Sequence, residues 1–222
     1  MGLFRGLWAP FRGAAFIAKH GLWGYVAFPL VANMAVALMA GAIAYWVASR
    51  WAFDHPGPWW QAGTAALALL LVVPTFLILY PVVSSPFIDI LTEKTESIVA
   101  GGHPTAGYLV GAVQAILHGA AKSALYLLAL ALTLALSIVS GPGALLGVFF
   151  GALFLAYDAF DFPLARRRIG FLGKWRYLAT SPGQTLGYAA MAALIFTIPL
   201  AFIIAPPFLA VGATLAYLDH RK

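Results

Sequence analysis

Long runs of apolar residues without any charge limit the folds open to this chain more than any other feature. No Asp, Glu, Lys or Arg occurs between Ala62 and Ile88, and a second uncharged run extends from Tyr25 to Ala48. Each run exceeds the ~20 residues with which a helix crosses a bilayer. Backbone groups in lipid must bond to one another, which only helices and closed barrels allow. The runs lack the alternation of barrel strands, so we predict an all-α integral membrane protein.

The composition agrees with a lipid environment. The chain is 63% hydrophobic and 9% charged, whereas a soluble domain carries about 25% charged residues. Its length suits a single membrane domain, residues 1–222. In so apolar a chain, the net charge of +6 indicates basic residues on the cytoplasmic side of a membrane rather than nucleic-acid binding. The absence of cysteine excludes disulfides and thiolate metal sites.

The N-terminal half divides into an amphipathic segment, two spans and a charged helix. Residues 1–20 are expected to form an interfacial helix, ended at His20 and Gly21, that lies in the headgroup plane. One face of this helix carries aromatic and aliphatic residues, and Arg5 and Arg12 lie on another face. The expected spans are residues 21–50 and 62–85, the second with a kink at Pro74. Pro86 is expected to open a separate charged helix, residues 86–100.

The C-terminal half is expected to contain two hairpins. The first covers residues 107–158, including His118 and Lys122, and its second apolar run of residues 144–157 is too short to span alone. A basic loop, residues 159–181, follows, and Ser181 and Pro182 favour a helix start. The second hairpin covers residues 182–218 and is expected to break at Pro199 and at Pro206–Pro207. Both hairpins are predicted to penetrate the bilayer fully or in part, and this arrangement places most positive charge on one side.

The helix 86–100 concentrates charge in an otherwise apolar chain. Asp89, Glu93 and Glu96 follow one another at helical spacing, so they share one face. Lys94 falls on the opposite, apolar face. It either extends to the membrane interface or points at a partner helix or an anion.

Motifs for covalent chemistry are missing, so the sequence predicts no catalytic residue, metal or cofactor. One hypothesis of enzymatic activity remains open. Asp158, Asp161 and the pair Ala165–Arg166 have the spacing that opens the CDP-alcohol phosphotransferase motif. Phe162 stands where that motif has glycine, and the later pair of aspartates is missing. Two carboxylates make a poor two-metal site.

Two stretches resemble a known family. The segment YPVVSSPFIDILTEKTE, residues 80–96, is similar to the hallmark stretch of the CysZ-like or etoposide-induced family of membrane proteins. The segment FDFPLARRRIGFLGKWRYL, residues 160–178, resembles its second signature, and HGLWGYVAFPLVANM, residues 20–34, resembles its first span. The family often has basic residues after this Gly-Leu, where the chain has Trp23 and Gly24.

This resemblance implies a multi-pass sulfate permease or channel of the bacterial inner membrane. It would supply sulfate for assimilation and cysteine biosynthesis without ATP hydrolysis, as a homo-oligomer in contact with membrane lipid. The alternative hypothesis is a non-transporting membrane scaffold or assembly factor. Small residues such as Gly151, Gly187 and Gly212 suit close helix packing under both hypotheses, so they do not separate them.

A transported sulfate ion needs donors that replace its water. We expect backbone amides at helix starts to supply them, together with serine hydroxyls and basic side chains. The expected pathway residues are Gly21, Leu22, Trp23, Ser84, Ser85, Phe87, Lys94, Arg166, Arg167 and Arg168. The three arginines alternatively bind phospholipid headgroups. Asp89, Glu93, Glu96 and Asp161 are expected to form a structural charge network, because carboxylates repel sulfate. Glu93 and His118 are the candidates for proton coupling.

Overall fold

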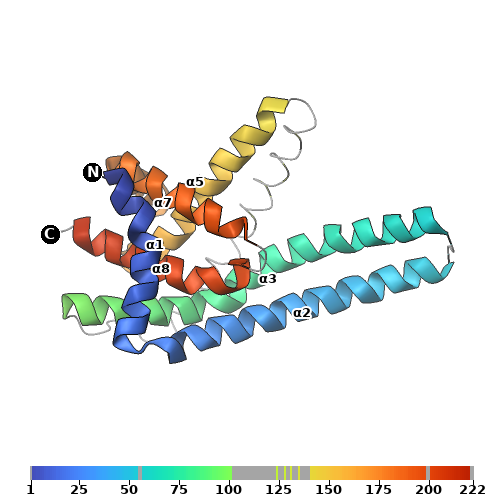
Figure 1. Ribbon diagram of the computed structural model, residues 1–222, viewed down its shortest axis with the longest axis horizontal. Coiled ribbons are helices and arrows are strands. Elements are labelled where there is room, and N and C mark those ends of the chain that lie inside the picture. Colours follow the sequence, from blue (N-terminus) through green and yellow to red (C-terminus); the bar gives the residue numbers. More distant parts are fainter. Residues whose placement is uncertain are drawn as a thin grey trace. The chain divides into compact units, whose positions relative to one another are not determined.

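The structure, a computed structural model, describes residues 2–54, 57–101, 124, 128, 131, 135, 141–198 and 201–220. These residues form helices and turns, with no strand among them, which confirms the all-α class. His118 and Lys122, and with them most of the predicted helix of residues 107–139, lie outside the described residues. The helices labelled in Figure 1 are α1 (Gly2–His20), α2 (Trp23–Asp54), α3 (Pro58–Ala100), α5 (Gly141–Ala165), α6 (Phe171–Thr180), α7 (Pro182–Phe196) and α8 (Ala201–His220).

Contacts divide the chain into two compact units. The first contains residues 1–30, 87–106 and 132–222, and the second contains residues 31–86 and 107–131. The first unit therefore holds α1, α5, α6, α7 and α8, the first turns of α2 and the charged end of α3. The second holds the apolar parts of α2 and α3, where Val36, Ala40 and Ala44 are buried on one face of α2. The predicted charged residues of α3 thus belong to the same unit as the three arginines.

Two of the described helical segments are long and apolar enough to cross a membrane. They are Trp23–Arg50 and Leu145–Ala165, and 19% and 33% of their apolar windows are buried. Large apolar side chains such as Phe28, Leu38 and Phe149 are exposed along them, as expected of surfaces that face lipid. This fits a membrane protein, while the number of spans and the depth of the hairpins stay predictions.

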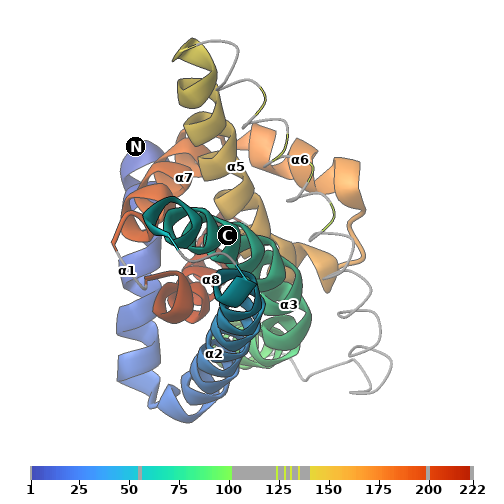
Figure 2. The same cartoon turned by 90° about the vertical axis from the view of Figure 1, so that its right-hand side faces the viewer.

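The first unit is built around close contacts of α1 with α7 and α8 (Figure 2). A Cβ atom added to Gly13 would lie 2.2 Å from the backbone oxygen of Phe208 in α8. A Cβ atom added to Gly187 in α7 would lie 2.2 Å from the backbone oxygen of Leu3. Only glycine lets two helix backbones approach this closely. This face of α1 could not be recognised from the sequence, because glycine and alanine add little to a hydrophobic pattern.

The end of α1 confirms the break that was predicted at His20 and Gly21. Gly21 has φ 64, and its N–H donates to the Ala18 oxygen at 3.4 Å. The N–H of Leu22 donates to the Ile17 oxygen at 3.1 Å, and the Ile17 and Leu22 side chains are buried in the same hydrophobic cluster. These two bonds and this contact make a Schellman motif.

The predicted start of a separate helix at Pro86 is wrong. α3 is one helix from Pro58 to Ala100, so it continues through Pro74 and Pro86. Proline removes one backbone bond and strains the preceding turn at a cost of about 3 kcal/mol. The long apolar helix tolerates this cost, as helices in membrane proteins do when neighbouring groups satisfy the freed carbonyl. The predicted end is confirmed, because α3 stops at Ala100 and Gly101 has φ 68.

The predicted basic loop of residues 159–181 is also wrong. α5 continues to Ala165 through Pro163, and α6 occupies Phe171–Thr180, so the connection shrinks to Arg166–Gly170. α5 therefore has 25 residues, enough to span a bilayer, and the expectation that this run is too short is corrected. The acids Asp158 and Asp161 lie on a helix because its other residues, such as Phe160 and Leu164, are buried against the bundle.

The last two helices follow the predicted hairpin with one difference. α7 starts at Pro182 after Ser181, as predicted, and ends at Phe196, before Pro199. The Ser181 side chain makes no capping bond. The break expected at Pro206–Pro207 is wrong, because both prolines lie inside α8 and are buried. We attribute the continuity to burial, since Val211, Ala213 and most of their neighbours in α8 are inaccessible.

Candidate functional site

Arg166 binds α3 to the end of α5. Its Nε lies 3.2 Å from the Asp89 carboxylate, and its Nη1 lies 3.5 Å from the Glu96 carboxylate. Its Nη2 donates to the Thr92 hydroxyl. Asp89, Thr92 and Glu96 are spaced by three, four and seven positions, so α3 presents them on one face to the guanidinium. The planar fork of arginine suits such a set of acceptors.

Arg167 completes this group and extends it to α8. Its Nη1 lies 3.1 Å from the Glu96 carboxylate and donates to the Pro163 oxygen at 2.8 Å. Its guanidinium carbon lies 4.5 Å from the centre of the Tyr217 ring of α8, which is within the range of a cation–π contact. We call Asp89, Thr92, Glu96, Arg166 and Arg167 the arginine–carboxylate cluster. It ties α3 and α5 together, with Tyr217 adding α8.

The cluster is partly buried, and this changes the pKa of carboxyl groups in and beside it. Burial raises the pKa of the Asp89 carboxyl above its ordinary value, and the nearby Arg166 guanidinium offsets part of this shift. Burial also raises the pKa of Glu93, again with Arg166 acting in the opposite direction. Arg166 Nη1 is buried without a hydrogen bond. The predicted network is thus seen for Asp89 and Glu96, whereas Glu93 forms no ion pair among the described residues.

Asp161, which was expected to join the same charge network, instead forms an ion pair of its own. Its carboxylate pairs with the Lys174 ammonium of α6, and the side chains are 6% and 2% exposed. Lys174 was not among the residues predicted to form the charge network. One signal was available, because Lys174 and Leu178 are one turn apart on the side of α6 that is buried. Because a lysine is almost never fully buried unless it is paired, a lysine on this buried side indicates a carboxylate partner.

This ion pair also bears on the enzyme reading of the same stretch. Asp161 is one of the two carboxylates that the phosphotransferase motif would use for metal, and here it binds a lysine. Among the residues described, no group of three His, Asp or Glu side chains is placed to hold a metal ion. The local chemistry is therefore that of a structural ion pair.

The first predicted anion site, at Gly21, Leu22 and Trp23, has fewer free donors than expected. The amides of Gly21 and Leu22 already bind carbonyls of α1. Of the amides of these three residues, that of Trp23, at the start of α2, has no backbone acceptor within the described part of the chain. Trp23 and Gly21 are exposed, and Leu22 is buried.

No helix begins at the second predicted anion site. Ser84, Ser85 and Phe87 lie inside the continuous α3, whose amides bond to carbonyls one turn earlier. Ser84 is buried and Ser85 is half-buried. The ring of Phe87 stacks on that of Phe28 of α2, with centroids 5.8 Å apart. These residues are therefore placed for packing, and only the serine hydroxyls could contribute side-chain donors.

Two predicted cations keep their charge available. Lys94 is exposed, and Arg168 is exposed in the turn after α5 with φ 55. Within the described part of the chain, neither side chain has an ion pair, in contrast to Arg166 and Arg167. The arginine triplet therefore separates into two residues that hold helices together and one that faces outward.

The family model and the known proteins that match this chain carry the same description. The family model described as sulfate transporter CysZ/etoposide-induced protein 2.4 matches residues 9–207. A sulfate transporter CysZ of Pseudomonas paraeruginosa is 26% identical over 228 residues, which cover 95% of this chain and 93% of that protein. A protein of the same name from Vibrio atlanticus is 26% identical, with 89% and 86% covered. One from Pectobacterium atrosepticum is 26% identical, with 96% and 84% covered.

Proposed function

Since this chain belongs to the family of the sulfate transporter CysZ and etoposide-induced protein 2.4, whose model matches residues 9–207, we propose that it transports sulfate across a bacterial inner membrane. The match over nearly the whole chain is the observation that supports this most strongly. The protein would work as a channel or permease without ATP hydrolysis and would supply sulfate for assimilation and cysteine synthesis. Its working form would be a homo-oligomer.

The charged side chains of the first unit fall into two groups, those that hold helices together and those that could attract sulfate. Arg166 and Arg167 are held by Asp89 and Glu96, so a sulfate ion would have to displace a carboxylate to reach them. We therefore assign the arginine–carboxylate cluster to positioning α3 and α5. Lys94 and Arg168 remain free to attract a dianion by electrostatic focusing. Among the predicted pathway residues, the Trp23 amide and the Ser85 hydroxyl could add uncharged donors.

Uptake of labelled sulfate into liposomes that contain only this protein tests the proposal. We expect uptake above that of empty liposomes, and a competing oxyanion in the buffer should reduce it. Lys94→Gln and Arg168→Gln should each lower the initial rate by about ten-fold, because each removes a cation that raises the local sulfate concentration. Arg176→Gln is the matched control, since Arg176 is exposed on α6 and, among the described residues, forms no ion pair.

Two results would count against these assignments separately. Folded protein that gives no more uptake than empty liposomes would overturn transport and favour a membrane scaffold. Undiminished uptake by both Lys94→Gln and Arg168→Gln would leave transport in place but remove these cations from the path.

A further inference from the structure

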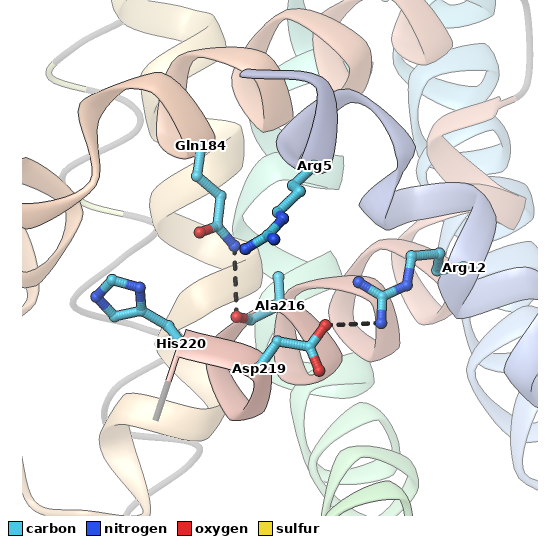
Figure 3. Close-up of a pocket in the computed structure, with 6 residues that line it drawn as sticks. All are labelled: Arg5, Arg12, Gln184, Ala216, Asp219 and His220. Carbon is cyan, nitrogen blue, oxygen red and sulfur yellow. Dashed lines mark hydrogen bonds and ion pairs between the residues drawn. The ribbon is translucent and has the colours of Figure 1, made fainter. Parts of the chain in front are cut away.

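A pocket lies where α1 meets the start of α7 and the end of α8. No residue of the arginine–carboxylate cluster lines it. It has a volume of about 250 Å³. Figure 3 shows its side chains, with Arg5 extending toward the Gln184 amide and Arg12 reaching across to Asp219. The lining residues are Arg5, Arg12, Gln184, Ala216, Asp219 and His220. All of them belong to the first unit, and none was assigned a role in sulfate transport above.

The pocket has an excess of positive charge. The Arg12 guanidinium lies 2.7 Å from the Asp219 carboxylate, so this pair is neutral and holds Arg12 in place. Within the described residues Arg5 has neither an ion pair nor a hydrogen bond, so its charge is not balanced locally. Gln184 donates to the Ala216 oxygen at 3.4 Å, which orients its amide at the pocket. An arginine, a fixed second arginine and an amide suit the oxygens of a phosphate group.

The surface beside the pocket is apolar and exposed. With 100° between successive residues of a helix, Arg5 and Arg12 lie between two faces of α1. On one side is the buried face of Gly6, Ala9 and Gly13. On the other side Phe4, Trp8 and Phe11 are 69%, 61% and 46% exposed. A cationic pocket that borders an exposed aromatic face matches a molecule with an anionic head and an apolar tail.

We propose that this pocket binds the phosphate of an anionic phospholipid headgroup, with Arg5 as the main ligand and the acyl chains along Phe4, Trp8 and Phe11. Asp219 does not oppose this, because it is paired with Arg12 and fixes that guanidinium beside the site. Binding would hold α1, and the α7 and α8 helices packed on it, at the level of the lipid phosphates. A free phosphate or sulfate ion shares the same oxyanion chemistry but cannot use the aromatic face.

Native mass spectrometry of the full-length protein in a non-ionic detergent can count bound lipids directly. The probes are dioctanoyl phosphatidylglycerol, which is anionic, and dioctanoyl phosphatidylcholine, which has the same chains and no net charge. We expect phosphatidylglycerol to bind at least about five-fold more tightly, as one arginine near the surface provides. Arg5→Gln should weaken phosphatidylglycerol binding by about the same factor and phosphatidylcholine binding by less, because choline already balances the charge of that phosphate. Arg176→Gln should leave both unchanged.

Several outcomes would overturn the proposal. Equal binding of the two lipids, or equal losses in Arg5→Gln and Arg176→Gln, would show that no specific headgroup site exists. Displacement of phosphatidylglycerol by inorganic phosphate or sulfate at the same concentration as the lipid would assign the pocket to a free oxyanion. If Arg5→Gln fails to fold, Arg12→Gln gives the same test, because it also removes one positive charge from the pocket and should likewise weaken phosphatidylglycerol binding. Lipid binding is measured without transport, so its result is independent of sulfate uptake.

Discussion

Replacing Gly187 by alanine tests the close packing of α1 on α7. The new Cβ atom would lie 2.2 Å from the Leu3 oxygen and 3.1 Å from the Leu7 nitrogen. Non-bonded atoms reach their optimal contact at about 3.5 Å, so α1 would have to retreat by roughly 1 Å. Both contacts are backbone atoms, and no side-chain rotation can relieve them. The strain therefore falls on the whole interface between the two helices.

The magnitude follows from two opposing terms. Overpacking that moves backbone costs about 3 kcal/mol, the upper part of the usual range. Alanine recovers about 1 kcal/mol relative to glycine inside a helix, which leaves a net loss of about 2 kcal/mol. For a chain of this size 1 kcal/mol shifts Tm by about 2–4 °C, so Tm should fall by about 4–8 °C. Thermal unfolding of the purified protein in detergent, followed by circular dichroism, measures this shift.

Gly151→Ala is the matched control for that experiment. Gly151 lies in α5, and a Cβ atom added there meets nothing within 4 Å. The same substitution should therefore raise Tm by about 2–4 °C through helix propensity alone. An unchanged Tm for Gly187→Ala, or an equal fall for Gly151→Ala, would refute the packing of α1 described here.

Two further predictions concern the buried charges. Lys174→Met should destabilise the protein by about 3–5 kcal/mol, because it strands the Asp161 carboxylate in the interior, and adding Asp161→Asn should restore part of the loss in the same thermal assay. If the double variant is no more stable than Lys174→Met, the ion pair is not the cause. Because the folded pKa of Asp89 lies above the ordinary 3.8, the folded state binds more protons, and stability should decrease as pH rises through the window just above that value. Asp89→Asn should flatten this part of the pH profile, and an unaltered profile would show that partial burial does not raise the pKa of Asp89.

The helices themselves could be predicted well from the chain alone. The uncharged runs, the break at Gly21, the start at Pro182 and the end at Gly101 all follow from hydropathy and from local backbone preferences. The errors occurred at proline. Pro86, Pro163 and the pair Pro206–Pro207 lie inside helices, because burial of the surrounding side chains outweighs a local penalty of about 3 kcal/mol per proline. Local preference and tertiary packing disagree there, and packing prevails.

The sequence predicted which acidic residues take part in the charge network but not which base each of them pairs with. Asp89, Glu93 and Glu96 were expected to belong to one charge network, and two of them, Asp89 and Glu96, form ion pairs with Arg166 and Arg167. The pairing of Asp161 with Lys174 was missed, since the sequence spacing does not show that α6 folds back on α5. The split of the triplet into two bound arginines and the exposed Arg168 was likewise invisible, because it depends on the direction in which α5 ends.

An all-α membrane protein of the sulfate transporter family was readable from the residues themselves, since hydropathy and short signatures are properties of neighbouring positions. Which glycines are indispensable, which cations are already paired and where a basic pocket opens were decided by tertiary structure. Gly187 and Gly151 are the same residue in the same kind of helix, and only the distance to α1 separates them. That distance joins positions far apart along the chain, and it exists only once the helices are packed.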